Sequence, residues 1–381
     1  MSNFTPEQLE RYKRHFFLDE VGPAGQEMLL GSKVLLIGAG GLGSPAALYL
    51  AAAGVGTLGL MDFDKVEVSN LQRQVLYGTR DVGRPKVEVA GERLRQLTPD
   101  VRIQAHEERL EASNAERILR DYDVVLDGTD TFASRYLAND VCVWLGRPLV
   151  YGSVMRFDGQ VSVFDAKRGP CYRCLFPEPP PPELAPNCAE AGVLGVVPGV
   201  IGLLQATEVL KLLLQQGEPL IGRLLVYEAL TMRFRQFSLP KDPDCAVCGT
   251  APTIHEPIDY EAFCAAAAGP VGSAVAELEP AQLKQRLEGS EDLLLIDVRE
   301  PFEAELARIG AARLIPLREL EEALEGLEDW KERALVVHCH HGPRSRAACE
   351  LLQSKGFSRV ENLRGGIDAW SLEVDSTVPR Y

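Results

Sequence analysis

The stretch Gly38–Gly43 reads GAGGLG and directly follows the apolar run Val34–Ile37. Its spacing is Gly-x-Gly-x-x-Gly, placed where an expected strand ends and a helix would begin. Glycines at these positions allow a tight turn and let backbone N–H groups approach a phosphate at the N-terminus of the helix. The motif therefore predicts a nucleotide site, although six residues alone are a weak signal.

The next question is whether that nucleotide is NAD or ATP. Asp62 ends the following apolar run, Leu58–Met61, at the spacing where a carboxylate holds ribose hydroxyls. Because both nucleotides contain an adenosine ribose, Asp62 does not discriminate between them. The segment Asp62–Gln74, DFDKVEVSNLQRQ, is more informative, since its uninterrupted polar residues and its arginine suit a triphosphate. The alternative is a solvated loop with ordinary helix caps.

The surroundings of this motif predict a parallel sheet covered by helices. Between residues 33 and 150, the apolar runs VLLIG, LGLMD, DVVLDG and PLVYG alternate with helix-like stretches, Ser44–Ala53 and Phe132–Leu145. Lys86 in GRPK could supply a further cation to phosphates. Asp130 in DGTDT would lie at the end of a parallel strand, where it could hold Mg²⁺.

Length and charge limit the possible functions. The 381 residues suggest two or three domains, and 40 basic against 55 acidic residues leave a formal charge of −15. This charge disfavours nucleic acids and anionic membranes as partners. The start, MSNFTPEQLE, has no charged segment followed by an apolar core, so we expect a cytoplasmic protein without a signal peptide. The apolar segment Ala191–Leu204 is interpreted as a buried helix rather than a membrane span.

A change in composition indicates where the first domain ends. APTIHEPIDY and the small-residue tract AAAAGPVGSA follow the last Cys-Gly pair, and the alternation of strands and helices restarts with LLLIDVR and ALVVHC. We therefore predict a first domain over residues 1–250, a linker over 251–273 and a second domain over 274–381.

Four of the nine cysteines form two Cys-x-x-Cys pairs, Cys171 with Cys174 and Cys245 with Cys248. Four thiolates with this spacing are typical of a tetrahedral structural zinc site. Two disulfides are the alternative, which a cytoplasmic location disfavours. Because the entropy of loop closure grows slowly with length, the long intervening segment is no obstacle.

Another cysteine, Cys188, follows the proline-rich stretch Pro177–Pro186, which we interpret as an extended surface crossover. Such a place lets a thiol meet a second protein, whereas the alternative is a buried and inert cysteine. Cys142, Cys264 and Cys349 lie on apolar or alanine-rich helical stretches and are interpreted as core residues.

Cys339 stands between an expected strand and a helix that starts near Arg344, in HCHHGPRSRAA. Loop amides and the helix dipole would then point at its sulfur and favour a thiolate or a persulfide anion. The alternative is a redox-silent cysteine beside a metal site at His340 and His341. Because adjacent histidines on a tight loop are expected to point apart, we disfavour that metal site.

Over residues 11–249 the chain resembles the MoeB/ThiF family of sulfur-carrier adenylyltransferases, which are relatives of ubiquitin-activating enzymes. The stretches that carry the resemblance occur in the family's order and are specific as a set. They are RYKRHFFLDEVGPAGQ, GAGGLGSP, DFDKVEVSNLQRQ, GRPK, LDGTD, GQVSVF, CYRC, NCAEAGVLG and CAVCG.

The resemblance implies that ATP, and not NAD, is bound. The carboxylate at the C-terminal Gly-Gly of a ubiquitin-like sulfur carrier would attack the α-phosphate, giving an acyl-adenylate and pyrophosphate. Arg73 and Lys86 would neutralise phosphates, and Arg14 would reach the partner's nucleotide in a homodimer. Thr131 stands where the family usually has Asn. The implied nucleotide positions are Gly41, Asp62, Ser69, Asn70, Leu71, Gln72, Arg73, Lys86, Asp130 and Thr131.

The same resemblance implies zinc at Cys171, Cys174, Cys245 and Cys248, and a covalent link between Cys188 and the activated carrier as a thioester or an acyl disulfide. The expected fold is α/β: a Rossmann-like ubiquitin-activating-enzyme fold with a parallel-sheet core and a zinc site. A smaller C-terminal α/β domain would follow it.

That second domain resembles rhodanese-like sulfurtransferases through LIDVREPFE, ARLIPL, LRGGIDAW and the Cys339 loop. Four residues separate Cys339 from Arg344, whereas related phosphatase loops have five. The stretch LARIGAARLIP departs from the family's usual His-Ile-Pro-Gly-Ala pattern, with Arg308 where His is common and Gly310 where Pro is common.

Joined, the two resemblances imply that a persulfide on Cys339 converts the activated carrier to a thiocarboxylate. The sulfur would come from a persulfide donor such as a cysteine desulfurase, and the carrier would be MoaD-like or ThiS-like. The pathway would be molybdenum cofactor, thiamin or tRNA thiolation. Two alternatives remain: an NAD-dependent oxidoreductase, which SNLQR and the cysteine quartet disfavour, and a rhodanese half that only docks partners, which the intact CHHGPRS loop disfavours.

Overall fold

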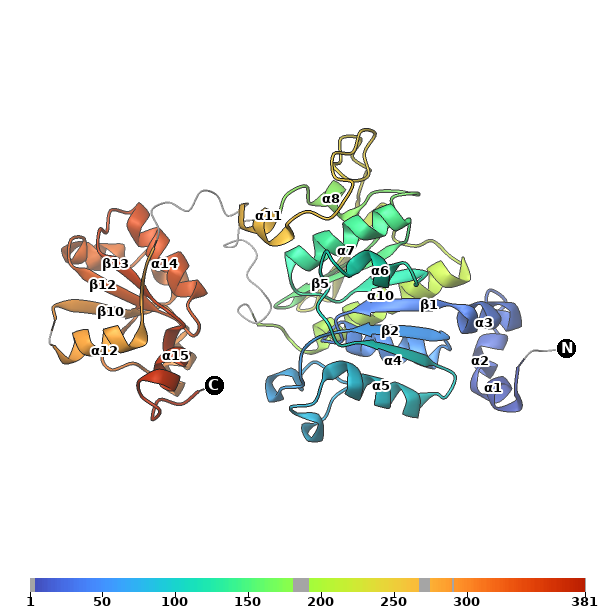
Figure 1. The fold of residues 1–381 in the computed structure, drawn as a ribbon, viewed down its shortest axis with the longest axis horizontal. Helices are drawn as coiled ribbons and strands as arrows, with labels where there is room; N and C mark the ends of the chain where they lie inside the picture. The colour runs from blue at the N-terminus through green and yellow to red at the C-terminus, as the bar shows by residue number, and fades with distance from the viewer. Residues whose placement is uncertain (1–3, 181–191, 267–274, 290, 381) are drawn as a thin grey trace. The chain divides into compact units, whose positions relative to one another are not determined.

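The computed structural model describes residues 4–180, 192–266, 275–289 and 291–380. The chain divides into two compact units, Met1–Gly269 and Pro270–Tyr381, each with its own sheet and core (Figure 1). The domain limits expected from composition, at residues 250 and 274, stay a prediction.

An eight-stranded sheet forms the centre of the first unit, in the order β3-β2-β1-β4-β5-β6-β7-β8. The five strands from β3 to β5 pair in parallel, and β6, β7 and β8 extend the sheet antiparallel. β1 lies between β2 and β4, so the strands that follow it in the chain are added first on one side of β1 and then on the other. This reversal of strand order opens a crevice at the carboxyl edge of the sheet. The strands are β1 (Lys33–Ile37), β2 (Thr57–Met61), β3 (Arg102–His106), β4 (Val124–Asp127), β5 (Leu149–Met155), β6 (Asp158–Phe164), β7 (Arg223–Glu228) and β8 (Arg233–Ser238).

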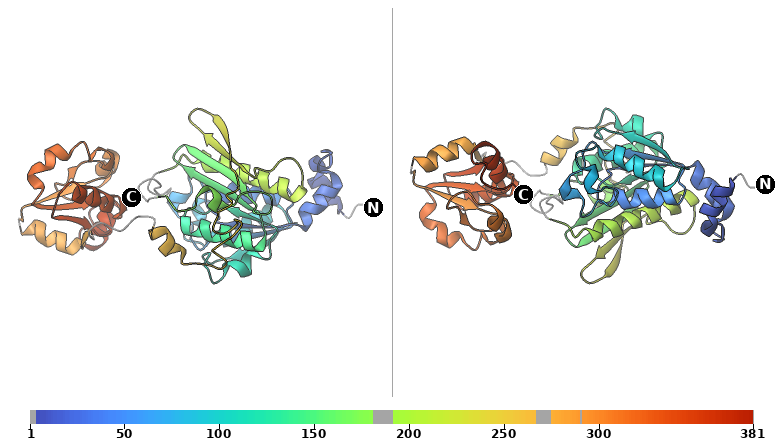
Figure 2. Two further views of the ribbon diagram at one scale, coloured as in Figure 1. Left: turned by 90° about the horizontal axis from the view of Figure 1, so that it is seen from above. Right: turned by 90° about the horizontal axis from the view of Figure 1, so that it is seen from below.

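Helices cover both faces of this sheet, and the β7–β8 hairpin projects from it (Figure 2). They are α1 (Pro6–Arg11), α2 (Lys13–Phe16), α3 (Gly22–Gly31), α4 (Gly43–Ala52), α5 (Lys86–Leu97), α6 (Ala115–Leu119), α7 (Phe132–Leu145), α8 (Tyr172–Leu175), α10 (Val196–Leu214) and α11 (Tyr260–Ala266), with the 3₁₀ turns η1 (Val68–Asn70) and η2 (Thr79–Asp81).

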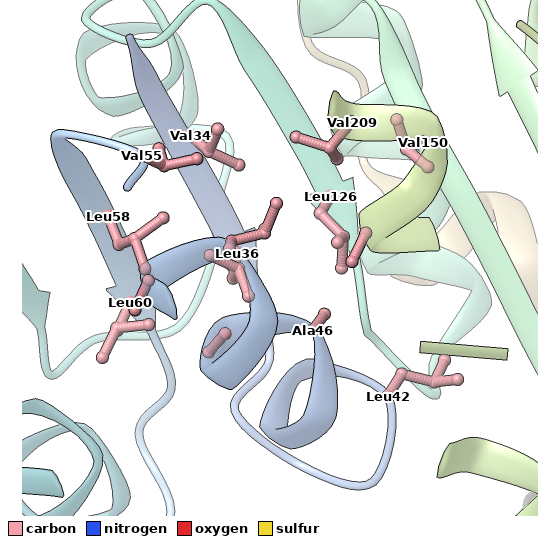
Figure 3. Close-up of a cluster of buried hydrophobic side chains, with 14 of the residues drawn as sticks. Val34, Leu36, Leu42, Ala46, Val55, Leu58, Leu60, Leu126, Val150 and Val209 are labelled. Carbon is pink, nitrogen blue, oxygen red and sulfur yellow. The ribbon is translucent and has the colours of Figure 1, made fainter. Parts of the chain in front are cut away.

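The continuous apolar run of β1 exists because both of its faces are covered. Val34 and Leu36 belong to the core cluster shared with α4 and α10, which Figure 3 shows, whereas Leu35 and Ile37 belong to the cluster shared with α6 and α7. All four side chains are at most 3% exposed. A strand buried on both faces cannot alternate between polar and apolar residues, which is typical of parallel sheets.

α10 is long and apolar enough to cross a membrane, with a mean hydropathy of 1.6 over 18 residues, but half of that window is buried inside the first unit. It packs against α4, β5 and β6. Its Gln205 is buried and donates to the carbonyl oxygens of Asp127 and Val150, at 2.7 and 3.1 Å. α10 is therefore a core helix, as we expected for the apolar segment that ends at Leu204.

The second unit has a five-stranded parallel sheet in the order β11-β10-β12-β13-β9, with helices on both faces. Its strands are β9 (Ala276–Leu278), β10 (Leu293–Asp297), β11 (Arg313–Leu314), β12 (Ala334–His338) and β13 (Val360–Leu363). Its helices are α12 (Pro280–Glu288), α13 (Pro301–Leu306), α14 (Pro343–Ser354) and α15 (Gly366–Glu373), with the 3₁₀ segments η4 (Leu317–Glu319) and η5 (Leu324–Trp330). A parallel five-stranded core in each unit, extended by three antiparallel strands in the first, confirms the predicted α/β class.

Part of the stretch that we predicted as a linker, residues 251–273, is packed against the first unit. α11 lies against α7. Its Tyr260 is 5% exposed and donates its hydroxyl to Asp140 at 3.0 Å. The sequence indicated a helical stretch around Cys264, but we assigned it to the linker, because its alanines also suit a flexible connection.

Candidate nucleotide cleft, cysteine cluster and sulfur loop

A cleft of about 370 Å³ lies where β1, β2 and β4 end, at the crevice described above. Its walls come from the glycine turn after β1, the segments after β2, β3 and β4, and the start of α10. The lining includes these members of the predicted nucleotide set: Gly41, Asp62, Arg73, Lys86, Asp130 and Thr131.

The glycine turn has a steric reason at two of its positions. Gly38 has φ +92°, and a Cβ added there would lie 2.7 Å from the carbonyl oxygen of Gly128. A Cβ on Gly43, at the first residue of α4, would lie 2.0 Å from the carbonyl oxygen of Gly38. Only glycine allows the backbone to turn this tightly and bring the helix N-terminus to the cleft.

Asp62 is held against this turn by its backbone neighbours. Its Oδ2 accepts a hydrogen bond from the amide of Ala39 at 2.9 Å, and its Oδ1 accepts one from the amide of Asp64 at 2.9 Å. Burial raises the pKa of Asp62, and the charge of Lys86 opposes that shift. The carboxylate is therefore fixed at the place where the sequence predicts a ribose contact.

Both of the predicted cations, Arg73 and Lys86, line the cleft. Lys86 at the start of α5 is 5% exposed, and its Nζ lies 2.8 Å from Oδ2 of Asp64. Arg73 is half-buried, and its Nη1 donates to the carbonyl oxygen of Ser69 at 2.9 Å.

Other predicted nucleotide residues lie beside the cleft without lining it: Ser69, Asn70, Leu71 and Gln72. Asn70 is buried and accepts a hydrogen bond from the amide of Glu67 at 3.2 Å, which shapes the turn η1. Arg14 lies exposed on α2 and does not line the cleft of its own chain.

Asp130 and Thr131 are exposed at the cleft, directly before α7. Thr131 is the N-cap of α7, since its hydroxyl oxygen accepts from the amide of Ser134 at 3.4 Å. An Asn would also cap a helix well, so the departure from the family pattern conserves this structural role.

Sequence reasoning missed a further cation in the cleft, Arg135. It is 8% exposed, its Nη2 donates to the carbonyl oxygen of Thr129 at 2.9 Å, and its Nε lies 3.6 Å from Oδ2 of Asp127. Burial raises the pKa of Asp127 while Arg135 lowers it. The available signal was an arginine in the first turn of the helix that follows Thr131.

The four cysteines of the two Cys-x-x-Cys pairs come together in space. Their sulfurs all lie within 4.8 Å of one another, with 3.5 Å between Cys171 and Cys245 and 3.4 Å between Cys174 and Cys248. A tetrahedron with metal–sulfur bonds of about 2.3 Å has edges of roughly 3.8 Å, so this donor set fits a zinc ion.

The cysteine cluster rests on a buried ion pair. Arg173, between two of the cysteines, donates from Nε and Nη2 to the carboxylate of Asp140 at 2.9 and 2.8 Å. Its guanidinium lies 4.7 Å from the ring centroids of both Tyr136 and Phe263. Because Phe263 comes from α11, the helix and the cysteine turn support each other.

Of the remaining cysteines, Cys188 lies outside the described residues. Cys142 and Cys349 are buried, as expected for core positions, whereas Cys264 is half-buried and packs at the edge of the core.

In the second unit, Cys339 follows β12 and precedes α14, as predicted. Cys339 is 1% exposed, and its sulfur accepts a hydrogen bond from the amide of Gly342 at 3.1 Å. The hydroxyl of Ser345 lies 3.4 Å from the same sulfur. The loop therefore offers its sulfur neutral donors close to a helix N-terminus.

Two carbonyl groups of the loop accept hydrogen bonds from α15. The amides of Ile367 and Asp368 donate to the carbonyl oxygens of Cys339 and His340, at 2.9 and 3.1 Å. A Cβ on Gly366, whose φ is +60°, would lie 2.4 Å from the carbonyl oxygen of His340. LRGGIDAW thus supplies the glycine that lets this helix approach the loop.

The two histidines of the loop do not point apart as we expected. Their rings stack, with 4.0 Å between the centroids of His340 and His341. Burial is the main reason that the pKa of His340 is lowered, followed by the charge of His341. Within the described residues the two rings belong to no cluster of three or more potential metal ligands.

With this geometry in place, comparison with known proteins assigns the family. Residues 12–247 match the ThiF family, and residues 279–373 match the rhodanese-like domain. The chain belongs to the ThiF family. It is 44% identical over 387 residues to the probable adenylyltransferase/sulfurtransferase MoeZ of Mycobacterium tuberculosis, covering 100% of this chain and 97% of that protein.

Two other relatives agree with this assignment. The sulfur carrier protein adenylyltransferase of Thermus thermophilus is 55% identical over 68% of this chain and 98% of its own length. The adenylyltransferase and sulfurtransferase MOCS3 of Anopheles gambiae is 41% identical over 100% of this chain and 90% of its own length. The prediction of a MoeB/ThiF-type domain followed by a rhodanese domain is confirmed.

Among solved structures, E. coli MccB superposes with a TM-score of 0.58 at 22% identity, covering 68% of this chain and 77% of MccB. A complex of E. coli MccB with ATP superposes with a TM-score of 0.54 at 21% identity, covering 65% and 82%. At this identity the likeness supports the fold.

Proposed function

We propose that this protein adenylates the C-terminal Gly-Gly carboxylate of a ubiquitin-like sulfur carrier with ATP and then converts the acyl group to a thiocarboxylate. The observation that carries the proposal is the cleft of the ThiF-family unit, where Asp62, Arg73 and Lys86 converge on the glycine turn. The names of the full-length relatives, adenylyltransferase and sulfurtransferase, support the same two activities.

In the adenylation step, the carrier's carboxylate oxygen attacks the α-phosphorus of ATP and pyrophosphate leaves. Asp62 holds the ribose, and the amides at the start of α4 face the phosphates. Arg73 and Lys86 stabilise the charge that develops on the α-phosphate and on the leaving group. The acyl-adenylate is a far better electrophile than the free carboxylate, which is what the ATP provides.

Two metals accompany this proposal. Asp130 offers an exposed carboxylate at the cleft, a suitable ligand for a Mg²⁺ ion that neutralises phosphate charge. Cys171, Cys174, Cys245 and Cys248 would hold a structural Zn²⁺ that cross-links the cysteine turn to the rest of the first unit.

In the sulfur-transfer step, a persulfide on Cys339 attacks the acyl carbon and AMP leaves, which gives an acyl disulfide between the carrier and Cys339. The thiolate of Cys188 then attacks the Cys339 sulfur, releasing the thiocarboxylate and forming a Cys188–Cys339 disulfide. A cellular dithiol reductant returns both cysteines to thiols. Alternatively, Cys188 takes the acyl group first, as a thioester.

The partners follow from this chemistry and from the family. A carrier of the MoaD or ThiS type supplies the carboxylate, and a persulfide donor such as a cysteine desulfurase supplies sulfur. We propose a homodimer in which the exposed Arg14 reaches the partner's nucleotide, and a location in the cytoplasm. The thiocarboxylate would serve molybdenum cofactor, thiamin or tRNA-thiolation pathways.

The experiment that tests the proposal incubates each candidate carrier with this protein, ATP and a persulfide donor, and weighs the carrier by mass spectrometry. We expect one carrier to gain the mass of an adenylate without donor, and the mass difference of one oxygen replaced by sulfur with donor. If no Gly-Gly carrier changes mass in the presence of ATP, the proposed function is wrong.

A further inference from the structure

The loop Cys339–Ser345 contains one arginine, Arg344, and a carboxylate from α13 holds its guanidinium. Nη1 of Arg344 donates to Oε2 of Glu303 at 2.7 Å, and Nη2 donates to Oε1 at 2.8 Å. Glu303 is 6% exposed and the arginine side chain is 24% exposed. A bidentate, partly buried pair is geometrically specific and is screened little by salt. The positive charge of the loop is therefore compensated within the protein.

Glu303 cannot easily move away from this arginine. Its Oε2 also accepts from the amide of Glu300 at 2.9 Å, as part of the capping box of α13. Arg299, which is fully buried, donates to the carbonyl oxygen of Glu303 at 3.3 Å and to Oδ2 of Asp297 at 2.6 Å. The motif DVREPFE thus ties α13 to the end of β10 and fixes the carboxylate beside the loop.

The other groups of the loop add little positive charge at the sulfur. Two groups lie within hydrogen-bond distance of the Cys339 sulfur, the Gly342 amide and the Ser345 hydroxyl, and both are neutral donors. Burial, and after it the charge of His341, lowers the pKa of His340, which disfavours a positive charge on its ring. His341 lies outward, 3.8 Å from the carboxylate of Asp368.

We propose that Glu303 determines the sulfur donor: by neutralising Arg344 it makes the loop accept sulfur from a persulfide and discriminate against thiosulfate. This rests on the proposed sulfur transfer at Cys339. A persulfide presents one charged sulfur that the loop amide and hydroxyl can solvate. Thiosulfate carries two charges and oxygens that require a cation. To reach Arg344 it would break both hydrogen bonds of the ion pair and leave the buried charge of Glu303 without that cation.

The loading step needs no oxidant. The Cys339 thiolate attacks the outer sulfur of the donor R–S–S⁻, the donor S–S bond breaks, R–S⁻ leaves, and the new bond joins the Cys339 sulfur to the transferred sulfur. With thiosulfate the same attack would release sulfite. The two donors thus differ in the leaving group and in the charge that the loop must hold. Glu303 affects the charge that the loop can hold.

The test compares cysteine persulfide with thiosulfate as donors to the full-length protein, with cyanide as acceptor and mass spectrometry of the Cys339 persulfide as a direct readout. We expect the wild type to prefer the persulfide in kcat/KM. Glu303→Gln should raise kcat/KM for thiosulfate about tenfold or more, mainly through KM, because one charge-assisted pair is released. Persulfide use should change far less. Glu305→Gln is the matched control, since that carboxylate is exposed on the same helix, α13, and it should leave the donor ratio unchanged.

An unchanged donor ratio in Glu303→Gln overturns the inference. If that variant does not fold, judged by its Tm, the wild type decides: equal or better use of thiosulfate overturns the inference, and a strong preference for the persulfide supports it. If neither donor loads Cys339, the proposed sulfur transfer itself fails. That result is distinct from a loaded Cys339 that shows no donor preference, which removes only the role of Glu303.

Discussion

Arg73 and Lys86 differ in how their own chain holds them. Lys86 is buried and forms an ion pair with Asp64, whereas Arg73 is half-buried and donates to a backbone carbonyl. Among the described residues no carboxylate lies within ion-pair distance of Arg73. Arg73 therefore enters the cleft with its charge uncompensated, which suits a group that stabilises a developing negative charge.

We expect Arg73→Ala to lose carrier-dependent exchange of pyrophosphate into ATP by about 10²-fold or more, because one preorganised cation is removed from the reacting phosphate. The Tm of the first unit should stay close to that of the wild type. Arg80→Ala, at an exposed arginine on η2, is the control and should exchange normally. Exchange at the wild-type rate in Arg73→Ala would contradict the assignment of this arginine to the ATP site.

A second residue-scale prediction concerns acid stability. His338 is fully buried on β12, and burial lowers its pKa from 6.5 to about 4. Since the folded-state pKa lies below the unfolded value, this contribution to stability is complete above about pH 6.5 and is lost as the pH falls towards 4. In calorimetry, the Tm of the second unit should fall less between about pH 6.5 and 4 in His338→Gln than in the wild type. In His341→Gln, at a side chain that is 64% exposed, it should fall as in the wild type. Parallel curves for the wild type and His338→Gln would contradict the prediction.

At the scale of elements, the two segments that carry Cys171–Cys174 and Cys245–Cys248 have little regular structure of their own. α8 has only four residues, and the other pair of cysteines lies in a turn without regular structure. Segments this short bury little apolar surface, so a cross-link must hold them.

We therefore expect a strong chelator to remove about one zinc per chain and to lower the Tm of the first unit, because four close thiolates repel one another without a cation. Zinc is measured by atomic emission before and after chelation. Cys171→Ser and Cys245→Ser should contain little zinc, whereas Cys142→Ser, at a buried cysteine outside the cluster, should contain as much as the wild type. Full zinc in the first two variants would show that the metal lies elsewhere.

α11 provides a further test at this scale. Tyr260 is buried and donates to Asp140, the carboxylate that Arg173 also contacts. Tyr260→Ala should cost about 2–4 kcal/mol in the free energy of unfolding of the first unit, because a large side chain and a buried hydrogen bond are lost together. Glu261→Ala, at an exposed position of the same helix, should cost far less. Equal stabilities by urea unfolding would mean that α11 is only a connection.

At the scale of the whole molecule, the two sheets have separate cores and separate sites. The residues that line the nucleotide cleft all belong to the first unit, and the sulfur loop belongs to the second. The two chemistries should therefore be separable by mutation.

Cys339→Ala should still form the acyl-adenylate but deliver far less sulfur, because its loop retains the amide and helix terminus without the nucleophile. Mass spectrometry of the carrier with ATP and a limiting persulfide donor should show adenylate without thiocarboxylate. Cys349→Ala, at a buried cysteine of α14, is the control for the loss of a thiol. Undiminished thiocarboxylate in Cys339→Ala would mean that sulfur bypasses this loop.

Much of this protein could be predicted from local sequence, because the features concerned are local in the chain. The alternation of apolar runs and helices predicts parallel sheets, and the runs are continuous because strands such as β1 are buried on both faces. The glycine turn, the cysteine spacing and the position of Cys339 before a helix are each contained in a few neighbouring residues. Their chemistry follows from residue type and spacing.

Only the tertiary structure decided which distant side chains meet. Arg135 reaches the cleft because α7 begins where β4 ends, and α11 packs on the cysteine turn because Arg173 lies between aromatic rings from two helices. The pairing of Arg344 with Glu303 joins residues 41 positions apart through the fold of the second unit. Such contacts depend on how strands and helices pack, which spacing along the chain does not specify. They also decide which charges are compensated, and therefore which ligands each site favours.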